Sequence, residues 1–534
     1  GTDNPGPLSL SPRRECPGDL TQPHRRGYRR LSLSAELGPG ARSPRPTHPR
    51  GPAALRLSSV GDTTRMAASP GDWRLLQTLS DKPTAEVVDG DVVSSVEFDH
   101  SGDYLATGDR AGRVRVYAKS EVPAQPLEGG ARSTPGSVMR SALFGRSSSA
   151  EKSTPPGGKT VEYRQWHEFQ SHEAEFDYLK SLEIEEKINS LRWCRPINSA
   201  FLMLTTNDKT IKLWKLQERK RPVAIVDGYS SGGKGGGGIR LPMFRKEVSI
   251  GATSRRVYSN GHAYHINSIS LNSDCEHFVS ADDLRINLWN LGVSNTSFNV
   301  VDIKPDNMEE LTEVITAACC HPTQCNTFLW SNSRGSVKLA DMRCKALCDE
   351  HAKVYEEEDD PSRRSFFSEI ISSIADIKFS SDGRYILSRD YMCLKLWDVN
   401  MESRPLRTIY VHEQLRSKLC DLYENDSIFD KFQCNFSGDN QRIMTGSYNN
   451  FFHVYDRNGR SDRCIEATKK PNKKPTRPMP KLRGKGSAAP EETEMDLDKK
   501  VLHCSWHPSM PLVAVGVLNS VYVFSDEAQG GAGP

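Results

Sequence analysis

The sequence contains one near match to a motif that performs phosphate chemistry. Residues 228–235 read GYSSGGKG, whereas a phosphate-binding loop requires G-x-x-x-x-G-K followed by a Ser or Thr whose hydroxyl binds Mg²⁺. Gly235 stands in place of that hydroxyl, and glycines continue to Gly238 where a helix should begin. We therefore interpret the segment as a flexible loop and reject nucleotide binding.

The histidines and cysteines do not form a recognisable catalytic or metal-binding set. No Ser-His-Asp order, nucleophile elbow or paired-carboxylate motif stands out, and His100, His321 and His507 recur at equivalent turns, which indicates a structural role. The thirteen cysteines include no C-x-x-C pair, and no His-x-His follows Cys344 and Cys348 to complete a zinc site. An odd, irregular set is typical of reduced thiols, so we expect a cytoplasmic or nuclear protein without catalytic residues or cofactors.

Acidic residues give the strongest candidate site. They recur in short clusters separated by apolar segments, and a broad surface lined by carboxylates would attract basic segments of a partner. Simple solvation explains such clusters equally well at this point. The clusters are Asp89 and Asp91; Glu183, Glu185 and Glu186; Glu309 and Glu310; Glu424 and Asp426.

These clusters lie between copies of a repeated unit. Each copy has an alternating apolar segment, a turn, a second segment ending in Thr or Ser, a polar turn, and an alternation ending in an aromatic residue. The period of two, as in Arg113 to Val116, indicates strands. Only Trp397 and Asp398 keep a literal Trp-Asp pair, yet the shared pattern predicts an all-β, seven-bladed WD-repeat propeller. The copies begin at Val92, Lys187, His265, Val314, Ile374, Phe429 and Val501.

The propeller is predicted to span residues 71–526. We expect Leu75, Leu76 and Leu79 to supply the outer strand of the last blade, which would hide the sheet edges. Residues 120–160, 217–245 and 462–498 are predicted to be flexible insertions, and residues 527–534 a disordered tail. The last insertion has a basic half, 469–485, and an acidic half, 491–498, and we interpret it as a solvated loop.

Residues 1–70 are predicted to be a disordered extension. They are rich in Arg, Pro, Gly and Ser, and MAASPGDW at Met66 looks like a natural translation start, so the preceding residues would be translated leader. An organelle transit peptide is the alternative. Residues 1–65 carry a net charge of +6 and leave −3 on the rest, which argues against general nucleic-acid binding. No apolar run reaches the length of a membrane span.

Propeller topology predicts that the acidic clusters share one face. In a four-stranded blade, the connection to the next blade emerges beside the turn between the second and third strands. The clusters should therefore lie near Asp283, while Asp109, Asp208 and Asp390 are expected to cap tight turns. In FDYLKSLEIEEKIN, residues 176–189, the apolar half should form the outer strand of a blade and leave the three glutamates at the bend.

Several long segments are similar to one known family. FDYLKSLEIEEKIN, NDKTIKLWK, HINSIS, SADDLRINLW, NMEELTEVIT, RSFFSEIISSI, RSKLCDLYENDSIFDKF and MTGSYNNFF occur in order between Val92 and Phe524. Together they resemble the WD-repeat B-type regulatory subunit of protein phosphatase 2A. Motifs of this length are highly specific.

The resemblance implies a propeller with no catalytic activity of its own and no nucleic-acid or membrane partner. It would dock on the HEAT-repeat scaffold (the A subunit) and present phosphorylated protein substrates, or inhibitor proteins, to the metal-dependent phosphatase (the C subunit). Asp89 and Arg110 replace a usual Glu and Lys and preserve the charge. The substrate-binding positions that the resemblance implies are Asp89, Arg110, Glu183, Glu185, Glu186, Tyr264, Asp283, Leu311, Glu424, Asp426 and Lys431.

One segment departs from the family pattern. After LWKL the family carries a long polar hairpin that reaches the scaffold, whereas residues 217–245 here are rich in glycine. Glycine weakens strand pairing, so the arm is expected to be shorter or mobile. A propeller adaptor of another complex, such as a ubiquitin ligase receptor, is the alternative function.

Overall fold

The structure of the chain is a computed structural model in which most of the sequence beyond residue 72 can be described. The described residues are 73–80, 86–123, 159–178, 181–196, 200–225, 243–349, 353–357, 365–469 and 496–526. The predicted extension at residues 1–70 and the tail at 527–534 lie outside them.

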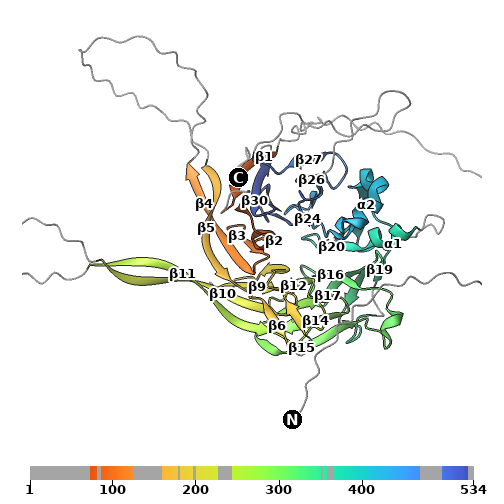
Figure 1. The fold of residues 1–534 in the computed structure, drawn as a ribbon, viewed down its shortest axis with the longest axis horizontal. Coiled ribbons are helices and arrows are strands. Elements are labelled where there is room, and N and C mark those ends of the chain that lie inside the picture. The colour runs from red at the N-terminus through yellow and green to blue at the C-terminus, as the bar shows by residue number, and fades with distance from the viewer. Residues whose placement is uncertain are drawn as a thin grey trace, which may run out of the picture. The chain divides into compact units, whose positions relative to one another are not determined.

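The described residues form seven four-stranded antiparallel sheets, as the repeats predicted (Figure 1). Blade one contains β2 (Val93–Phe98), β3 (Tyr104–Asp109), β4 (Arg113–Pro123) and β5 (Lys159–Gln170). Blade two contains β8 (Ser190–Trp193), β9 (Phe201–Thr206), β10 (Ile211–Ile225) and β11 (Met243–Tyr258). Blade three contains β12 (Ser268–Leu271), β13 (His277–Ala281), β14 (Arg285–Asn290) and β15 (Val293–Asp302).

The remaining blades repeat this order. Blade four contains β16 (Ile315–Cys320), β17 (Thr327–Asn332), β18 (Val337–Asp341) and β19 (Lys353–Tyr355). Blade five contains β20 (Ile374–Phe379), β21 (Tyr385–Asp390), β22 (Cys393–Asp398) and β23 (Arg407–Tyr410). Blade six contains β24 (Cys434–Phe436), β25 (Arg442–Gly446), β26 (Phe451–Asp456) and β27 (Asp462–Glu466). Blade seven contains β28 (Cys504–Trp506), β29 (Leu512–Val517), β30 (Ser520–Asp526) and β1 (Trp73–Leu79).

The innermost strands close a ring. Each of them contacts the innermost strand of the next blade, and β28 of blade seven contacts β2 of blade one. The predicted closure is confirmed, because β1 pairs antiparallel with β30 from Trp73 opposite Asp526 to Leu79 opposite Val521. The start of the propeller therefore completes the sheet at its end.

The core lies between neighbouring blades. All six residues of β29 are buried, because sheets stacked face to face cover both sides of a middle strand. Val513 and Val515 pack toward blade six with Phe452, whereas Ala514 packs toward blade one with Leu105. The alternation of side chains along the strand thus distributes one apolar segment between two interfaces.

A buried hydrogen-bond network around His262 stabilises blade three, and the sequence patterns did not identify it. In blade three, His262 contacts Asp282 (Nδ1 to Oδ2, 2.9 Å) and Ser280 (Nε2 to Oγ, 2.5 Å), and the indole of Trp289 donates to the same Ser280 hydroxyl. Burial raises the pKa of Asp282, but the hydrogen bond and charge interaction with His262, together with the N–H groups of Leu284 and Arg285, lower the pKa overall.

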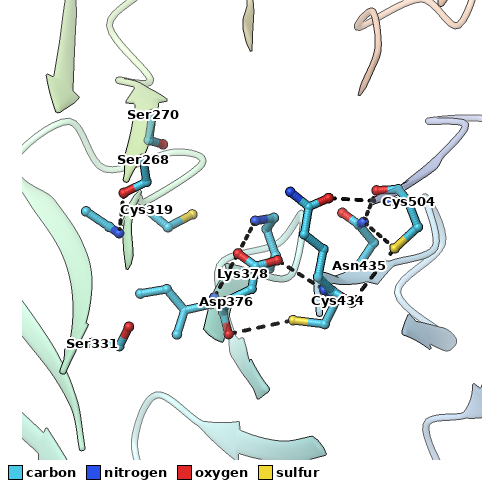
Figure 2. A network of polar contacts seen from close by, with 12 residues as sticks. Ser268, Ser270, Cys319, Ser331, Asp376, Lys378, Cys434, Asn435 and Cys504 are labelled. Carbon is cyan, nitrogen blue, oxygen red and sulfur yellow. Dashed lines mark hydrogen bonds and ion pairs between the residues drawn. The ribbon is translucent and has the colours of Figure 1, made fainter. Parts of the chain in front are cut away.

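Polar side chains of the innermost strands also join adjacent blades (Figure 2). Asp376 of blade five accepts from Lys378 Nζ at 2.6 Å and from the backbone N–H of Cys434 in blade six at 3.0 Å. Asn435 Nδ2 in turn donates to the carbonyl of Cys504 in blade seven at 2.6 Å. These bonds satisfy polar groups that face the propeller axis.

The structure corrects three predicted boundaries. β4 and β5 include residues 120–123 and 159–160, and β27 occupies 462–466. Residues 124–158 and 470–495 of those two insertions lie outside the described residues. The arm at 217–245 is not short: β10 and β11 stay paired from Ile211 opposite Tyr258 to Ile225 opposite Met243, and Figure 1 shows them running away from the ring. Only 226–242, which include the whole glycine-rich loop, lie outside the description.

The helical elements lie in the connections between blades. They are η2 (Asp89–Asp91), η3 (Met308–Glu310), α1 (Phe366–Ser372), η5 (Glu413–Lys418), α2 (Leu419–Glu424) and η6 (Ser427–Phe429). Ser365 and Ser368 form a capping box that begins α1. In the described part of the chain, no helix is long and apolar enough to cross a membrane.

Candidate functional site

The connections between blades and the turns between second and third strands share one face, as predicted. The backbone N–H of Ile188, just before β8, donates to the carbonyl of Asp109 at 3.2 Å. Ile266 donates in the same way to Asp208 at 2.9 Å, and Ile315 to Asp283 at 2.7 Å. Each bond joins the start of one blade to the turn of the blade before it. We call this side of the propeller the top face.

Some of the aspartates in these turns cap the turn by accepting from its backbone N–H groups, and others do not. Asp109 and Asp390 cap their turns as expected: Asp109 accepts from the N–H of Arg113 at 2.9 Å, and Asp390 from that of Met392 at 2.9 Å. The prediction for Asp208 is wrong, because Asn207 caps that turn by accepting from Thr210 N–H at 2.8 Å. Asp208 instead accepts from Asn189 at 2.7 Å.

Asp283 is free of the capping role as well. In its turn the cap is the preceding residue, Asp282, which accepts from the N–H groups of Leu284 and Arg285. Asp283 is half-buried on the top face. Burial raises the pKa of its carboxyl, while the nearby cation of Lys431 acts in the opposite direction. A residue of blade three and a residue of the connection before blade six are therefore close enough to interact.

Two further candidate residues are paired with each other. Arg110 Nη1 lies 2.5 Å from Asp89 Oδ1, and both side chains are exposed, at 40% and 76%. An exposed pair of this kind contributes little to stability. Both groups thus remain available to a charged partner.

The three glutamates lie beside a small hairpin that the sequence did not predict. β6 (Glu175–Asp177) pairs only with β7 (Leu182–Ile184), so FDYLKSL does not form the outer strand of a blade; β5 does. Glu183 lies in β7, and Glu183 and Glu185 are exposed. Glu186 is half-buried, and its carbonyl lies 2.8 Å from where a side chain on Gly112 would begin, a close approach that needs glycine at φ +75°.

The other candidates lie in separate connections of the top face. Tyr264 precedes β12 and is half-buried, and Leu311 ends η3 and is also half-buried. Glu424 ends α2, and Asp426, at φ +56°, precedes η6; both are exposed. The structure thus pairs Asp89 with Arg110 and brings Lys431 near enough to Asp283 to act on its charge, whereas the remaining residues lie in separate connections.

An exposed aromatic cluster beside Glu424 was missed by the sequence analysis, which considered mainly charges. The ring of Tyr423 lies 5.6 Å from that of Phe366, 6.1 Å from that of Phe367 and 6.0 Å from that of Phe429. Phe366 is 66% exposed and Phe429 is 54% exposed. The signal was present in RSFFSE and LYENDSIF, where aromatic residues stand next to acids at the ends of short helices.

The predicted structural role of the turn histidines is confirmed for two of them. His321 Nδ1 accepts from the N–H of Gln324 at 3.1 Å, and its ring fills the space above Gly383 of the next blade. His507 accepts from the N–H of Met510 at 2.9 Å and occupies the same position above Gly102. Throughout the described ranges, no three His, Cys, Asp or Glu residues are arranged to hold a metal ion.

The match to a known repeat family agrees with this architecture. Residues 76–118 and 253–290 match the family described as WD domain, G-beta repeat. A solved structure, that of Chaetomium thermophilum Raptor, aligns at a TM-score of 0.45 and 10% identity over 86% of this chain and 30% of that chain.

Two curated relatives are more informative. The chain is 46% identical over 504 residues to the serine/threonine-protein phosphatase 2A regulatory subunit phr2AB of Dictyostelium discoideum, covering 85% of this chain and 98% of that protein. It is 50% identical over 456 residues to the B beta isoform of the 55 kDa regulatory subunit of phosphatase 2A from Carassius auratus, covering 82% of this chain and 95% of that protein. Both are named regulatory subunits rather than enzymes. The chain belongs to the family of B-type 55 kDa regulatory subunits of protein phosphatase 2A.

Proposed function

We propose that this chain is the substrate-targeting subunit of a protein phosphatase 2A heterotrimer. The observation that carries the proposal is the exposed aromatic cluster next to exposed carboxylates on the top face. Phe366, Tyr423 and Phe429 offer apolar anchors, and Glu424 and Asp426 attract Lys or Arg. Such a surface suits a basic, amphipathic segment of a phosphorylated substrate or an inhibitor protein.

Targeting would accelerate dephosphorylation by proximity. A substrate held on the propeller meets the phosphatase active site at an effective concentration in the millimolar range, on the order expected for linked sites. The chemical step then becomes effectively intramolecular. The propeller itself need contribute no catalytic group.

We assign docking on the HEAT-repeat scaffold to the two-stranded arm. β9 pairs with β10 only from Ile211 to Leu216, so beyond that residue β10 and β11 leave the blade together. A long paired hairpin can reach a neighbouring protein of the complex while the top face stays open. Assembly and substrate binding would then depend on different parts of the chain.

This separation gives the test. Asp283→Lys and Glu185→Lys should weaken binding of a phosphopeptide flanked by Lys and Arg at least about tenfold, since each reverses a charge facing the peptide. Assembly with scaffold and catalytic subunits, measured by co-purification, should be unchanged. Glu276→Lys is the matched control, because Glu276 is exposed in the turn between β12 and β13, on the opposite face. Equal loss of assembly and substrate binding would contradict the proposal.

Affinity purification from native extract tests the partners. Recovery of a HEAT-repeat scaffold with Ser/Thr phosphatase activity is expected. Recovery of ubiquitin ligase subunits without phosphatase activity would overturn the assignment in favour of a different adaptor role.

A further inference from the structure

Basic side chains, three cations and one imidazole, gather where the innermost strands begin on the top face. Lys187, Lys431 and His503 lie just before β8, β24 and β28, and Arg110 lies in the turn after β3. They come from the beginnings or turns of blades one, two, six and seven, which are consecutive in the ring. We call the four residues the mouth cluster: Arg110, Lys187, Lys431 and His503.

Backbone hydrogen bonds hold the cluster together in two pairs. The bond from Ile188 N–H to the Asp109 carbonyl brings Lys187 near Arg110, since Lys187 directly precedes Ile188 and Arg110 directly follows Asp109. The bond from Gln433 N–H to the Leu502 carbonyl, 3.0 Å, likewise brings the segment that contains Lys431 next to His503. These positions follow from the ring itself and not from flexible side chains.

The two pairs act on each other electrostatically. Burial, together with the charges of Lys187 and Arg110, lowers the pKa of His503 to about 3. Burial also lowers the pKa of Lys431; Asp283 opposes this shift and Lys187 adds to it. Lys187 is therefore close enough to act on both His503 and Lys431, so positive charge is concentrated where these residues meet.

The negative charge beside the cluster compensates it only in part, since Asp283 acts on Lys431 but no ion pair joins the two in the described residues. Arg110 is paired with Asp89, but that pair is exposed and exchangeable. In the described ranges of the chain, no carboxylate lies within ion-pair distance of Lys187 or Lys431, and the buried Nδ1 of His503 has no hydrogen-bond partner. Unpaired cations and an unsatisfied imidazole nitrogen in one place create a site that a bound anion would stabilise.

We propose that the mouth cluster binds a phosphoryl dianion, carried by a phosphorylated protein segment or present as inorganic phosphate. A phosphoryl group brings up to two charges and three acceptor oxygens, which match several cations approaching from separate blades better than one carboxylate does. The acidic residues around the cluster admit a phosphate on a basic segment and repel polyanions. Only the identity of this carrier rests on the proposed targeting function.

Binding to the purified full chain tests the site. Titration calorimetry with inorganic phosphate, and with a phosphoserine peptide and its unphosphorylated form, should show binding of the phosphate-bearing ligands only. Lys187→Met and Lys431→Met should each weaken it at least about tenfold, whereas Lys304→Met, an exposed lysine of the β15–β16 connection, should not. A peptide bound much more tightly than inorganic phosphate identifies a protein-borne ligand; equal affinity identifies free phosphate.

A second readout does not depend on variants that fold poorly. Added phosphate should shift the imidazole NMR signals of His503 and raise its pKa from about 3, because the anion offsets the neighbouring cations. Unchanged His503 signals, or equal phosphate binding by wild type and both lysine variants, would overturn the site. If phosphate fails to bind while Asp283→Lys still weakens substrate binding, only this inference fails and the targeting function stands.

Discussion

Glu97 of β2 is half-buried and incompletely paired. Its Oε1 lies 3.5 Å from Arg192 Nη1, while its buried Oε2 has no hydrogen-bond partner. Burial raises the pKa of Glu97 to about 7, against the opposing charges of Arg192 and Lys378. In the folded protein the carboxyl is therefore protonated below about pH 7 and ionised above it.

This shift makes stability depend on pH. In the unfolded chain the carboxyl of Glu97 titrates near pH 4.3, so between that value and about 7 the folded state holds more protons. Its contribution to stability is present at low pH and is lost as the pH rises through 7. Relative to Glu97→Gln, wild type should lose up to about 3 kcal/mol of unfolding free energy between pH 4.5 and 8.

Urea denaturation at several pH values measures this difference. Glu276→Gln, at an exposed site, provides the control and should follow wild type at every pH. Parallel curves for wild type and Glu97→Gln would show that Glu97 remains ionised in the folded protein.

Individual residues were predictable where one residue type has one dominant role. Asp109 and Asp390 stand alone in their turns, and the expected capping followed. In Asn207-Asp208 and Asp282-Asp283 two competent caps are adjacent, and the backbone conformation of the turn decides which side chain folds inward. The residue type at a single position does not show which of the two side chains caps the turn.

Among the elements, β1 has the clearest energetic role. Leu79 is 7% exposed and packs with Val521, Val523 and Phe98 across the junction of blades seven and one. Its side chain thus fastens the closing strand to two blades.

Leu79→Ala should lower the unfolding free energy by about 2–4 kcal/mol, because it leaves a cavity in a buried interface. Chemical denaturation followed by tryptophan fluorescence measures the change. Thr78→Ala, one residue earlier and half-buried, should cost less than about 1 kcal/mol. Equal, small effects would mean that β1 frays and does not carry the closure.

The elements that the sequence mispredicted are hairpins outside the regular repeat. The apolar residues of β6–β7 suggested a buried strand, yet Phe176 is 49% and Tyr178 85% exposed, with rings 4.9 Å apart. The hydrophobic pattern shows which residues could be buried, but the pairing partner decides whether they are. For the arm, continuous pairing of β10 and β11 up to residue 225 outweighed the glycines that follow.

At the scale of the whole molecule, the repeats were sufficient to predict the fold. Seven copies of one pattern can bury their faces only against each other, so their number and order determined the ring. The distribution of charge on the top face was not predictable in the same way. The candidate residues suggested an acidic surface, whereas the ring brings lysines from distant repeats together inside that acidic surround.

The acidic surround should act at long range. Association of a Lys- and Arg-rich peptide with the assembled heterotrimer should slow several-fold between 50 and 300 mM salt, because the screening length falls below the size of the face. Dissociation should change less, as the aromatic contacts are not screened. Stopped-flow fluorescence separates the two rates, and Glu185→Lys should flatten the salt dependence. A salt-independent association rate would show that charge does not steer the encounter.

The pairing of β1 with β30 also has a consequence for synthesis. β1, the first strand of the propeller, emerges from the ribosome long before its partner, so until β30 follows, β1 keeps an unpaired edge. During translation the ring therefore stays open until its last strand is made, and a chain terminated before β30 keeps the unpaired edge of β1. Cells should handle such products as clients of chaperones and proteases, since the last strand made is the one that closes the molecule.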